Sequence, residues 1–167
     1  MKQKFKHTYM QTAKLWANMS SAVKLKVGAV IVSEEAIVVG YNGTPEGWDN
    51  VCEKREWMPQ GCLHLDHEYP FVEYSDYDDT AIIGRYRLTT KSEVLHAEMN
   101  AISKLAKSTL SGKGAVLFCT HSPCLSCAKA VYQAGIREVY YANNYRSDEG
   151  VLFLKKCGVK VELLEEE

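Results

Sequence analysis

Four residues in the second half of the chain have the types and spacing of a zinc site. Glu98 follows His96 by two residues, and Cys124 and Cys127 lie further along in the segment Pro-Cys-Leu-Ser-Cys. One imidazole and two thiolates are good zinc ligands, and a tetrahedral zinc with only three protein ligands keeps its fourth position for water. A purely structural site would be closed by a fourth protein ligand. The pattern therefore predicts a catalytic zinc bound by His96, Cys124 and Cys127, with Glu98 as a proton shuttle.

The elements around these residues explain how they would meet. Apolar residues recur at helical intervals from about residue 95 to 107, which puts His96 in a first helical turn. Cys124 and Cys127 are three residues apart after a proline, which suits the start of a second helix with both sulfurs on one face. The apolar segment 115–119 indicates a buried strand between the two helices. Two helix N-termini would then face one metal and favour thiolate over thiol.

Other interpretations of the same residues compete with a catalytic zinc. A redox pair made of Cys124 and Cys127 would leave the His-Ala-Glu segment at 96–98 unexplained. Half of a structural zinc ribbon would need a second Cys-x-x-Cys, which the sequence lacks. A non-catalytic, zinc-stabilised nucleotide-sensing domain would use the same ligands, but it has no need of an open coordination position or of Glu98.

The composition is typical of a compact enzyme. The chain has 167 residues with 46% hydrophobic content, which fits a single domain spanning residues 1–167. Its 20 basic and 21 acidic residues leave a formal charge of −1, which argues against a nucleic-acid-binding surface but allows a local phosphate pocket. No apolar run approaches membrane-spanning length, and the lysine-rich start lacks the apolar core of a signal peptide. We therefore expect a cytoplasmic protein that binds neither nucleic acid nor membrane.

The remaining pattern predicts an α/β fold with three layers. Beyond the zinc-site elements, the chain indicates a helix at about 5–19, strands at 27–32 and 37–41, a strand at 138–141, a helix at 149–156 and a strand at 159–163. The short connection between the first two strands makes them an antiparallel hairpin, and the alternating strands and helices further on imply parallel crossovers. We expect a five-stranded mixed sheet with helices on both faces, interrupted by an irregular insertion at about 49–91.

Three blocks of sequence make the chain resemble a known family. They are the segment 27–32 (VGAVIV) with 40–47 (GYNGTPEG), the segment 96–102 (HAEMNAI), and the segment 122–130 (SPCLSCAKA) with 133–136 (QAGI). The H-x-E and P-C-x-x-C pair is the signature of zinc-dependent nucleobase deaminases. With the first block added, the chain is similar over nearly its whole length to the deoxycytidylate (dCMP) deaminases of the cytidine deaminase superfamily, and its size and insertion resemble the phage members.

The resemblance implies a reaction and a form of regulation. It implies zinc-dependent deamination of dCMP to dUMP for thymidylate synthesis, in the host cytoplasm if the gene is carried by a phage. It also implies a homo-hexamer activated by dCTP and inhibited by dTTP, each bound with Mg²⁺ at a separate site. The alternative enzyme is a deaminase of free cytidine or deoxycytidine. A requirement for the 5′-phosphate would distinguish a dCMP deaminase from it.

Further site residues follow from position and resemblance. Asn42 resembles the family asparagine that hydrogen-bonds the substrate, and backbone groups of Ala97, Ser122 and Pro123 are expected to meet the base. Six cationic residues are candidates for the phosphate, with His121 the best placed by position: Lys24, Lys26, Lys104, Lys107, His121 and Arg146.

The glycine-rich turn at 40–47 has two interpretations. By resemblance, Lys24, Asn42 and Gly43 are candidates for the allosteric nucleotide site, because a turn of this kind can present backbone amides to a ligand. An ordinary turn that positions Asn42 for the active site is an equally good interpretation.

A second metal site is a weaker possibility. Some phage members bind a structural zinc through a cysteine just before the first strand, where this chain has Ser-Ala-Val at 21–23. Cys52, Cys62, His64 and His67 within the insertion offer alternative ligands. The competing interpretation is that the histidines are polar loop residues or nucleotide contacts.

Overall fold

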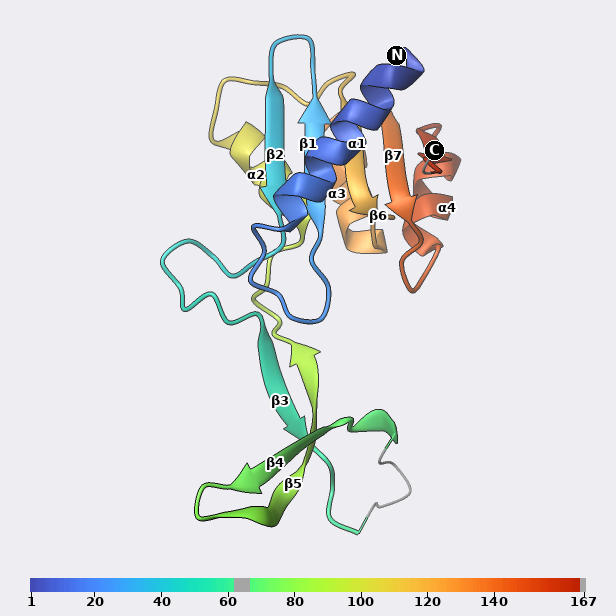
Figure 1. Cartoon of the computed structure of the whole chain (residues 1–167). Helices are drawn as coiled ribbons and strands as arrows, with labels where there is room; N and C mark the ends of the chain where they lie inside the picture. The colour runs from blue at the N-terminus through green and yellow to red at the C-terminus, as the bar shows by residue number, and fades with distance from the viewer. Residues whose placement is uncertain (62–66, 166–167) are drawn as a thin grey trace.

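A five-stranded mixed sheet forms the centre of the computed structural model, which describes residues 1–61 and 67–165 (Figure 1). The strands lie in the order β2-β1-β6-β7-β8. Strand β1 pairs antiparallel with both β2 and β6, whereas β6, β7 and β8 are parallel. Their bounds are Gly28–Val32 for β1, Ile37–Tyr41 for β2, Val116–His121 for β6, Glu138–Asn143 for β7 and Lys160–Leu163 for β8. The predicted hairpin, the parallel strands and the mixed sheet are confirmed.

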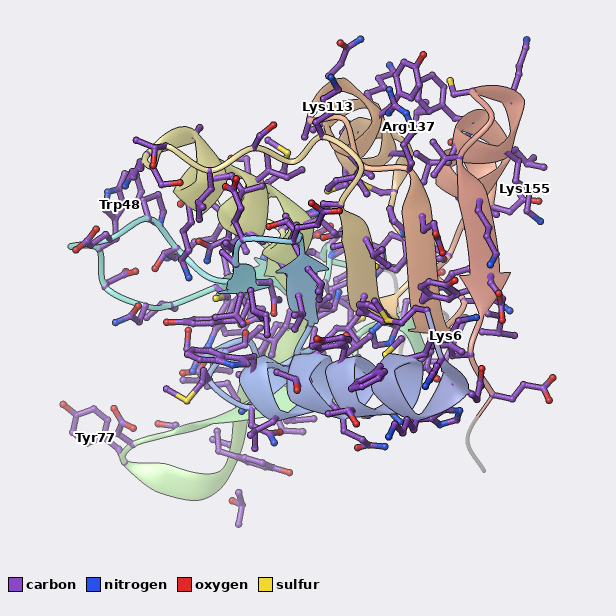
Figure 2. The ribbon with its side chains drawn as sticks, turned by 90° about the horizontal axis from the view of Figure 1, so that it is seen from above. Lys6, Trp48, Tyr77, Lys113, Arg137 and Lys155 are labelled. Atoms are coloured by element: carbon purple, nitrogen blue, oxygen red, sulfur yellow. The ribbon has the colours of Figure 1, made fainter. Side chains whose placement is uncertain are left out.

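Helices cover both faces of this sheet, as predicted. Helix α1 (Gln3–Ala17) lies on one face, and α2 (Ala97–Ala106), α3 (Leu125–Gln133) and α4 (Glu149–Lys156) lie on the other (Figure 2). Strand β1 is buried along its whole length, and its side chains alternate between the two layers. Ala29 and Ile31 join the core beneath α2, α3 and α4, whereas Val30 and Val32 pack with Met10 of α1. A fully apolar strand in the middle of a three-layer sandwich is the result.

Two glycines in the hairpin let helices approach the sheet closely. A Cβ on Gly28 would lie 2.0 Å from the Ala13 carbonyl oxygen in α1. A Cβ on Gly40 would lie 2.3 Å from the Ala97 carbonyl oxygen in the first turn of α2. Since real Cβ atoms do not approach this closely, the absence of a side chain at Gly40 fixes how near the start of α2 lies to β2.

The insertion is a second, smaller sheet, so the expectation of an irregular segment at 49–91 was wrong. Strands β3 (Glu53–Trp57), β4 (Phe71–Ser75) and β5 (Asp78–Thr90) pair antiparallel in the order β3-β5-β4. This sheet, called the arm below, projects away from the five-stranded body (Figure 1). Strand β3 reads Glu-Lys-Arg-Glu-Trp, and most of its side chains are solvent-exposed. A strand without a buried face has no apolar alternation, so the sequence signal for it is absent.

The sequence also predicts a protein that does not bind a membrane. Within residues 1–61 and 67–165, no helix has the length and apolar character needed to cross a bilayer.

Candidate functional site

The three predicted zinc ligands meet at the N-termini of two helices. His96 is the residue that caps α2, Cys124 caps α3, and Cys127 lies in the first turn of α3. Nδ1 of His96 is 3.5 Å from Sγ of Cys124 and 3.4 Å from Sγ of Cys127, and all three ligand atoms lie within 4.8 Å of one another. Tetrahedral zinc, with bonds of about 2.3 Å to sulfur and about 2.0 Å to nitrogen, would separate such a nitrogen and sulfur by about 3.5 Å. The donor set therefore fits zinc in both chemistry and spacing.

The three potential ligands shift one another's proton affinities. Contact with Cys127, and next with His96, lowers the pKa of the Cys124 thiol to about 3. The same contact, followed by burial, raises the pKa of Cys127. Contact with Cys124 also raises the pKa of His96. A divalent cation that bound here would displace protons from the thiols and from the imidazole, because only thiolate and neutral imidazole are metal ligands.

Glu98 is a buried carboxyl group beside this cluster. It lies in the first turn of α2, and only 4% of its surface is exposed. Burial raises its pKa, while the nearby His96 opposes the rise. The carboxylate is not among the clustered ligand atoms. It is therefore available to move protons next to a metal without occupying a coordination position.

A cavity of about 360 Å³ opens over the cluster and is large enough for a small-molecule ligand. Its walls include His96, Glu98 and Cys124, and also Ala97 and His121 among the predicted substrate contacts. Asn42 and Ser122 line it as well, whereas the side chain of Pro123 is fully buried and does not. Most of the residues selected from the sequence are therefore brought together in one cavity.

The side chains of Asn42 and Ser122 are already hydrogen-bonded to the chain itself. Oδ1 of Asn42 accepts from the Val27 amide at 2.7 Å, and Nδ2 donates to the Leu25 carbonyl at 2.9 Å. Oγ of Ser122 accepts from the Tyr145 amide at 2.8 Å. Each side chain therefore holds a loop that borders the cavity, and their contacts to a substrate stay predictions.

The glycine-rich turn offers fewer free amides than the sequence suggested. The Gly43 amide donates to the Leu95 carbonyl at 3.1 Å, and the Leu95 amide donates back to Gly43 at 2.8 Å. The Asn42 amide donates to Val27. These bonds tie the turn to the residue before His96, which favours the interpretation that the turn positions the active site.

Two of the six phosphate candidates stand out. Lys24 and Arg146 line the cavity as exposed cations, whereas Lys26, Lys104 and Lys107 are not among its lining residues. Lys104 instead donates to the Val39 carbonyl at 2.7 Å. His121 lines the cavity, but burial lowers its pKa, so its neutral form is favoured at neutral pH. Lys24 and Arg146 are therefore the better sources of positive charge.

Sequence reasoning missed the part of the wall that the arm supplies. Glu53, Thr89 and Thr90 line the cavity at the base of the arm, and Tyr145 lines it beside Arg146. Glu53 of β3 and Thr90 of β5 are paired residues. No motif marks these positions, because they reach the cavity only through the pairing of the arm strands.

The second metal site finds no support among the described residues. Cys52 is 1% exposed, packs with Ala22 and Val94, and has its sulfur 3.4 Å from Oγ of Ser21. His67 is exposed, and Cys62 and His64 lie outside the described residues. Within the described part of the chain, the His96 cluster is the only group of three or more potential ligands.

The chain is similar to known proteins in both sequence and structure. The model of the "cytidine and deoxycytidylate deaminase zinc-binding region" family matches residues 3–143. The deoxycytidylate deaminase of enterobacteria phage T4 is 34% identical, over 92% of this chain and 86% of the phage protein. The human deoxycytidylate deaminase is 32% identical, over 84% of this chain and 67% of the human protein. A crystal structure of the cyanophage S-TIM5 dCMP deaminase with dCMP and dUMP is 38% identical, with a TM-score of 0.75 over 98% of this chain and 99% of that one.

Proposed function

This chain belongs to the cytidine and deoxycytidylate deaminase family, and on that premise we propose that it hydrolyses dCMP to dUMP and ammonia. One observation carries the proposal. A single cavity brings a His/Cys/Cys ligand set and a buried carboxyl group together with two exposed cations, Lys24 and Arg146. The first two features suit hydrolytic deamination of a base, and the cations suit a nucleotide that carries a phosphate. The relatives named as deoxycytidylate deaminases support the same substrate.

Zinc is the metal that the donor set supports, and His96, Cys124 and Cys127 would hold it. When bound, it supplies a water molecule whose pKa is lowered toward 7, so that a nucleophile is available at neutral pH. The N-termini of α2 and α3 point their positive dipole ends toward the same place and favour anionic groups there.

Glu98 moves the protons of the reaction. It accepts one proton from the water that attacks C4 of cytosine and delivers it to N3, which breaks the aromaticity of the ring. It then takes the second proton from the new oxygen and delivers it to the amino group, which leaves as ammonia. Burial suits this double role, because the raised pKa brings the carboxyl group closer to the pH at which it must both accept and release a proton.

The substrate phosphate is assigned to Lys24 and Arg146, with His121 contributing a neutral hydrogen bond. Charge-assisted hydrogen bonds to a phosphate contribute about 1.5–3 kcal/mol each. Removing the phosphate should therefore lower kcat/KM by about tenfold or more. Asn42, Ala97 and Ser122, which line the same cavity, would orient the sugar and base.

Purified protein incubated with dCMP tests the proposal. We expect dUMP and ammonia, with kcat/KM for dCMP at least about tenfold above that for deoxycytidine. Equal rates with the two substrates would favour a free-nucleoside deaminase. Binding of dCMP without turnover by the zinc-loaded protein would favour a nucleotide-sensing domain instead.

We also propose that the enzyme is a homo-hexamer regulated by dCTP and dTTP with Mg²⁺ in the cytoplasm, on the strength of the family resemblance. Plots of rate against dCMP concentration should then be sigmoidal without an effector and hyperbolic with dCTP, and dTTP should lower the rate. Each effector would act by binding one conformational state more tightly than the other. Analytical ultracentrifugation tests the hexamer. Hyperbolic kinetics that neither triphosphate changes would leave an unregulated deaminase.

A further inference from the structure

Glu53 is a buried carboxylate that belongs to the arm but faces the cavity of the body. It is the first residue of β3, is 7% exposed, and lines the cavity together with Lys24. A buried carboxylate is costly unless hydrogen bonds compensate for the lost water. The proposed chemistry gives Glu53 no part in proton transfer, so its position needs another explanation.

The hydrogen bonds of Glu53 lead to the segment that carries Lys24. Its Oε1 accepts from the Val23 amide at 3.0 Å and from the Lys24 amide at 3.1 Å. Both bonds are charge-assisted if the carboxylate is ionised, and they use one oxygen of the group. They also join residues 23 and 24, which precede β1, to a strand that begins about thirty positions later in the chain.

Other contacts hold the chain just before this segment: Ala22 is buried against Cys52 and Val94, and Oγ of Ser21 lies 3.4 Å from the Cys52 sulfur. Val23 is 73% exposed and Leu25 is 38% exposed, so the side chains on either side of Lys24 do little to fix the backbone by apolar burial. Asn42 holds the far end through Leu25 and Val27. Glu53 holds the near end, and Lys24 lies between the two anchors. The side chain of Lys24 therefore leaves from a backbone that two polar side chains, one from the body and one from the arm, keep in position.

We propose that Glu53 is a positioning residue, which fixes the backbone at Val23 and Lys24 so that the Lys24 ammonium group is presented to the substrate phosphate. The inference rests on the proposed function, since it takes the substrate to be a nucleotide. Holding a cation in its bound arrangement lowers the entropy lost on binding. The arm is thereby part of the substrate site through its base, although its strands extend away from the body.

Steady-state kinetics of Glu53→Ala on the zinc-loaded enzyme tests the proposal. We expect KM for dCMP to rise by about three- to tenfold with kcat nearly unchanged, because the lost arrangement affects phosphate binding and not proton transfer. The constants for deoxycytidine, which lacks the phosphate, should stay the same. Glu53→Gln keeps an oxygen that can accept from both amides and should restore most of the loss. Glu73→Ala is the matched control, since Glu73 is an arm carboxylate that pairs with Arg55 and does not line the cavity.

A double variant separates positioning from a general structural effect. If Glu53 acts through Lys24, the dCMP penalty of Glu53→Ala should largely vanish in a Lys24→Ala background. Additive penalties, or equal losses with dCMP and deoxycytidine, would overturn the proposal.

Amide hydrogen exchange gives a readout that does not depend on turnover. The Val23 and Lys24 amides should exchange faster in Glu53→Ala than in the wild type, while the amides of β6 stay protected. Unchanged exchange at both positions would contradict the inference even if dCMP is the substrate. Failure of the wild-type enzyme to convert dCMP would instead overturn the proposed function, so the two failures are distinguishable. If Glu53→Ala does not fold, Glu53→Asp, whose side chain is one methylene shorter and should not reach both amides, replaces it in the kinetic and exchange measurements.

Discussion

The body and the arm are both built around β-sheets, but different interactions hold them together. The central strand of the body is buried throughout, and helices cover both faces of its sheet. In the arm, of the residues from 49 to 91 whose burial the structure describes, only Cys52, Glu53 and Tyr69 are buried. Tyr77 at its tip is fully exposed and lies far from the helices (Figure 2). Apolar burial therefore dominates in the body and contributes little in the arm.

Charged and aromatic side chains take the place of a core in the arm. Arg55 pairs with Glu73 and lies over the ring of Tyr86, with 4.7 Å between the guanidinium carbon and the ring centroid. The Tyr86 ring is in turn 5.4 Å from the rings of both Trp57 and Phe71. Exposed ion pairs of this kind contribute little to stability, and cross-strand aromatic pairs contribute modestly.

This difference suggests a division of labour. The body supplies the groups that perform chemistry, because helix N-termini packed on a rigid sheet hold their ligands precisely enough for a metal. The arm supplies one wall of the cavity and an anchor for Lys24 at its base. Changes in the body should therefore abolish the reaction or the fold, and changes far along the arm should do neither.

Loss of a metal ligand should have the largest effect. Cys124→Ser replaces a thiolate with a hydroxyl group that stays protonated at neutral pH and is a poor zinc ligand. We expect zinc content to fall from one per chain to a small fraction and dUMP formation to fall below detection. Metal analysis of freshly purified protein measures the zinc content. As the control, Glu73→Ala in the arm should keep its zinc. A Cys124→Ser protein with full zinc content would show that the sulfur of Cys124 is not a ligand.

Removal of the proton shuttle should come next. Glu98→Gln keeps the shape of the side chain but cannot carry protons, so kcat for dCMP should fall by about 10²–10⁴-fold while zinc content and Tm stay near wild type. Single-turnover measurements distinguish this loss from slow product release. Turnover near the wild-type rate would show that another group moves the protons.

These two predictions involve the part of the molecule that could be predicted best from the sequence. The cluster of His96, Cys124 and Cys127, the strand between them and the helix at 149–156 were predictable, because buried elements leave an apolar periodicity and potential zinc ligands are few in type. The arm strands were missed because they have no fully buried face: β3 is mostly charged, and the apolar residues of β4 and β5 stay exposed or half-buried. Glu53 was missed for a related reason, since its role depends on long-range pairing and on two backbone amides that no side-chain motif reveals.

A crowding substitution beneath the metal cluster should have an intermediate effect. A Cβ on Gly150 of α4 would lie 2.0 Å from the carbonyl oxygen of Pro123 and 2.8 Å from the carbonyl carbon of Cys124. Gly150→Ala should therefore push the ligand loop away and cost about 1–3 kcal/mol of unfolding free energy, with weaker zinc binding. Gly43→Ala is the control, since its Cβ would meet only a Tyr41 ring atom at 3.9 Å. Denaturant unfolding that is the same for both variants would mean that α4 does not support the cluster.

The smallest effect is expected from Arg87, which connects three parts of the arm. Its guanidinium bonds Glu56 at 2.6 Å and Glu68 at 3.5 Å, and it lies 5.0 Å from the centroid of the Tyr69 ring. Arg87→Ala should loosen the arm strands without affecting the base of the arm, where Glu53 anchors residues 23 and 24. We expect faster amide exchange in β4 and β5, a small decrease in Tm, and unchanged kcat/KM for dCMP.

The contrast between Arg87→Ala and Glu53→Ala is the sharpest test of the boundary between the two regions. If the arm acts only through its base, the Arg87 variant should show none of the rise in KM for dCMP expected of the Glu53 variant. Glu68→Gln, which removes the charge of a carboxylate 3.5 Å from the same guanidinium, should behave like Arg87→Ala. A rise in KM for dCMP in all three variants would mean that the whole arm holds Lys24 in place, because loosening any of its strands would then reach the cavity.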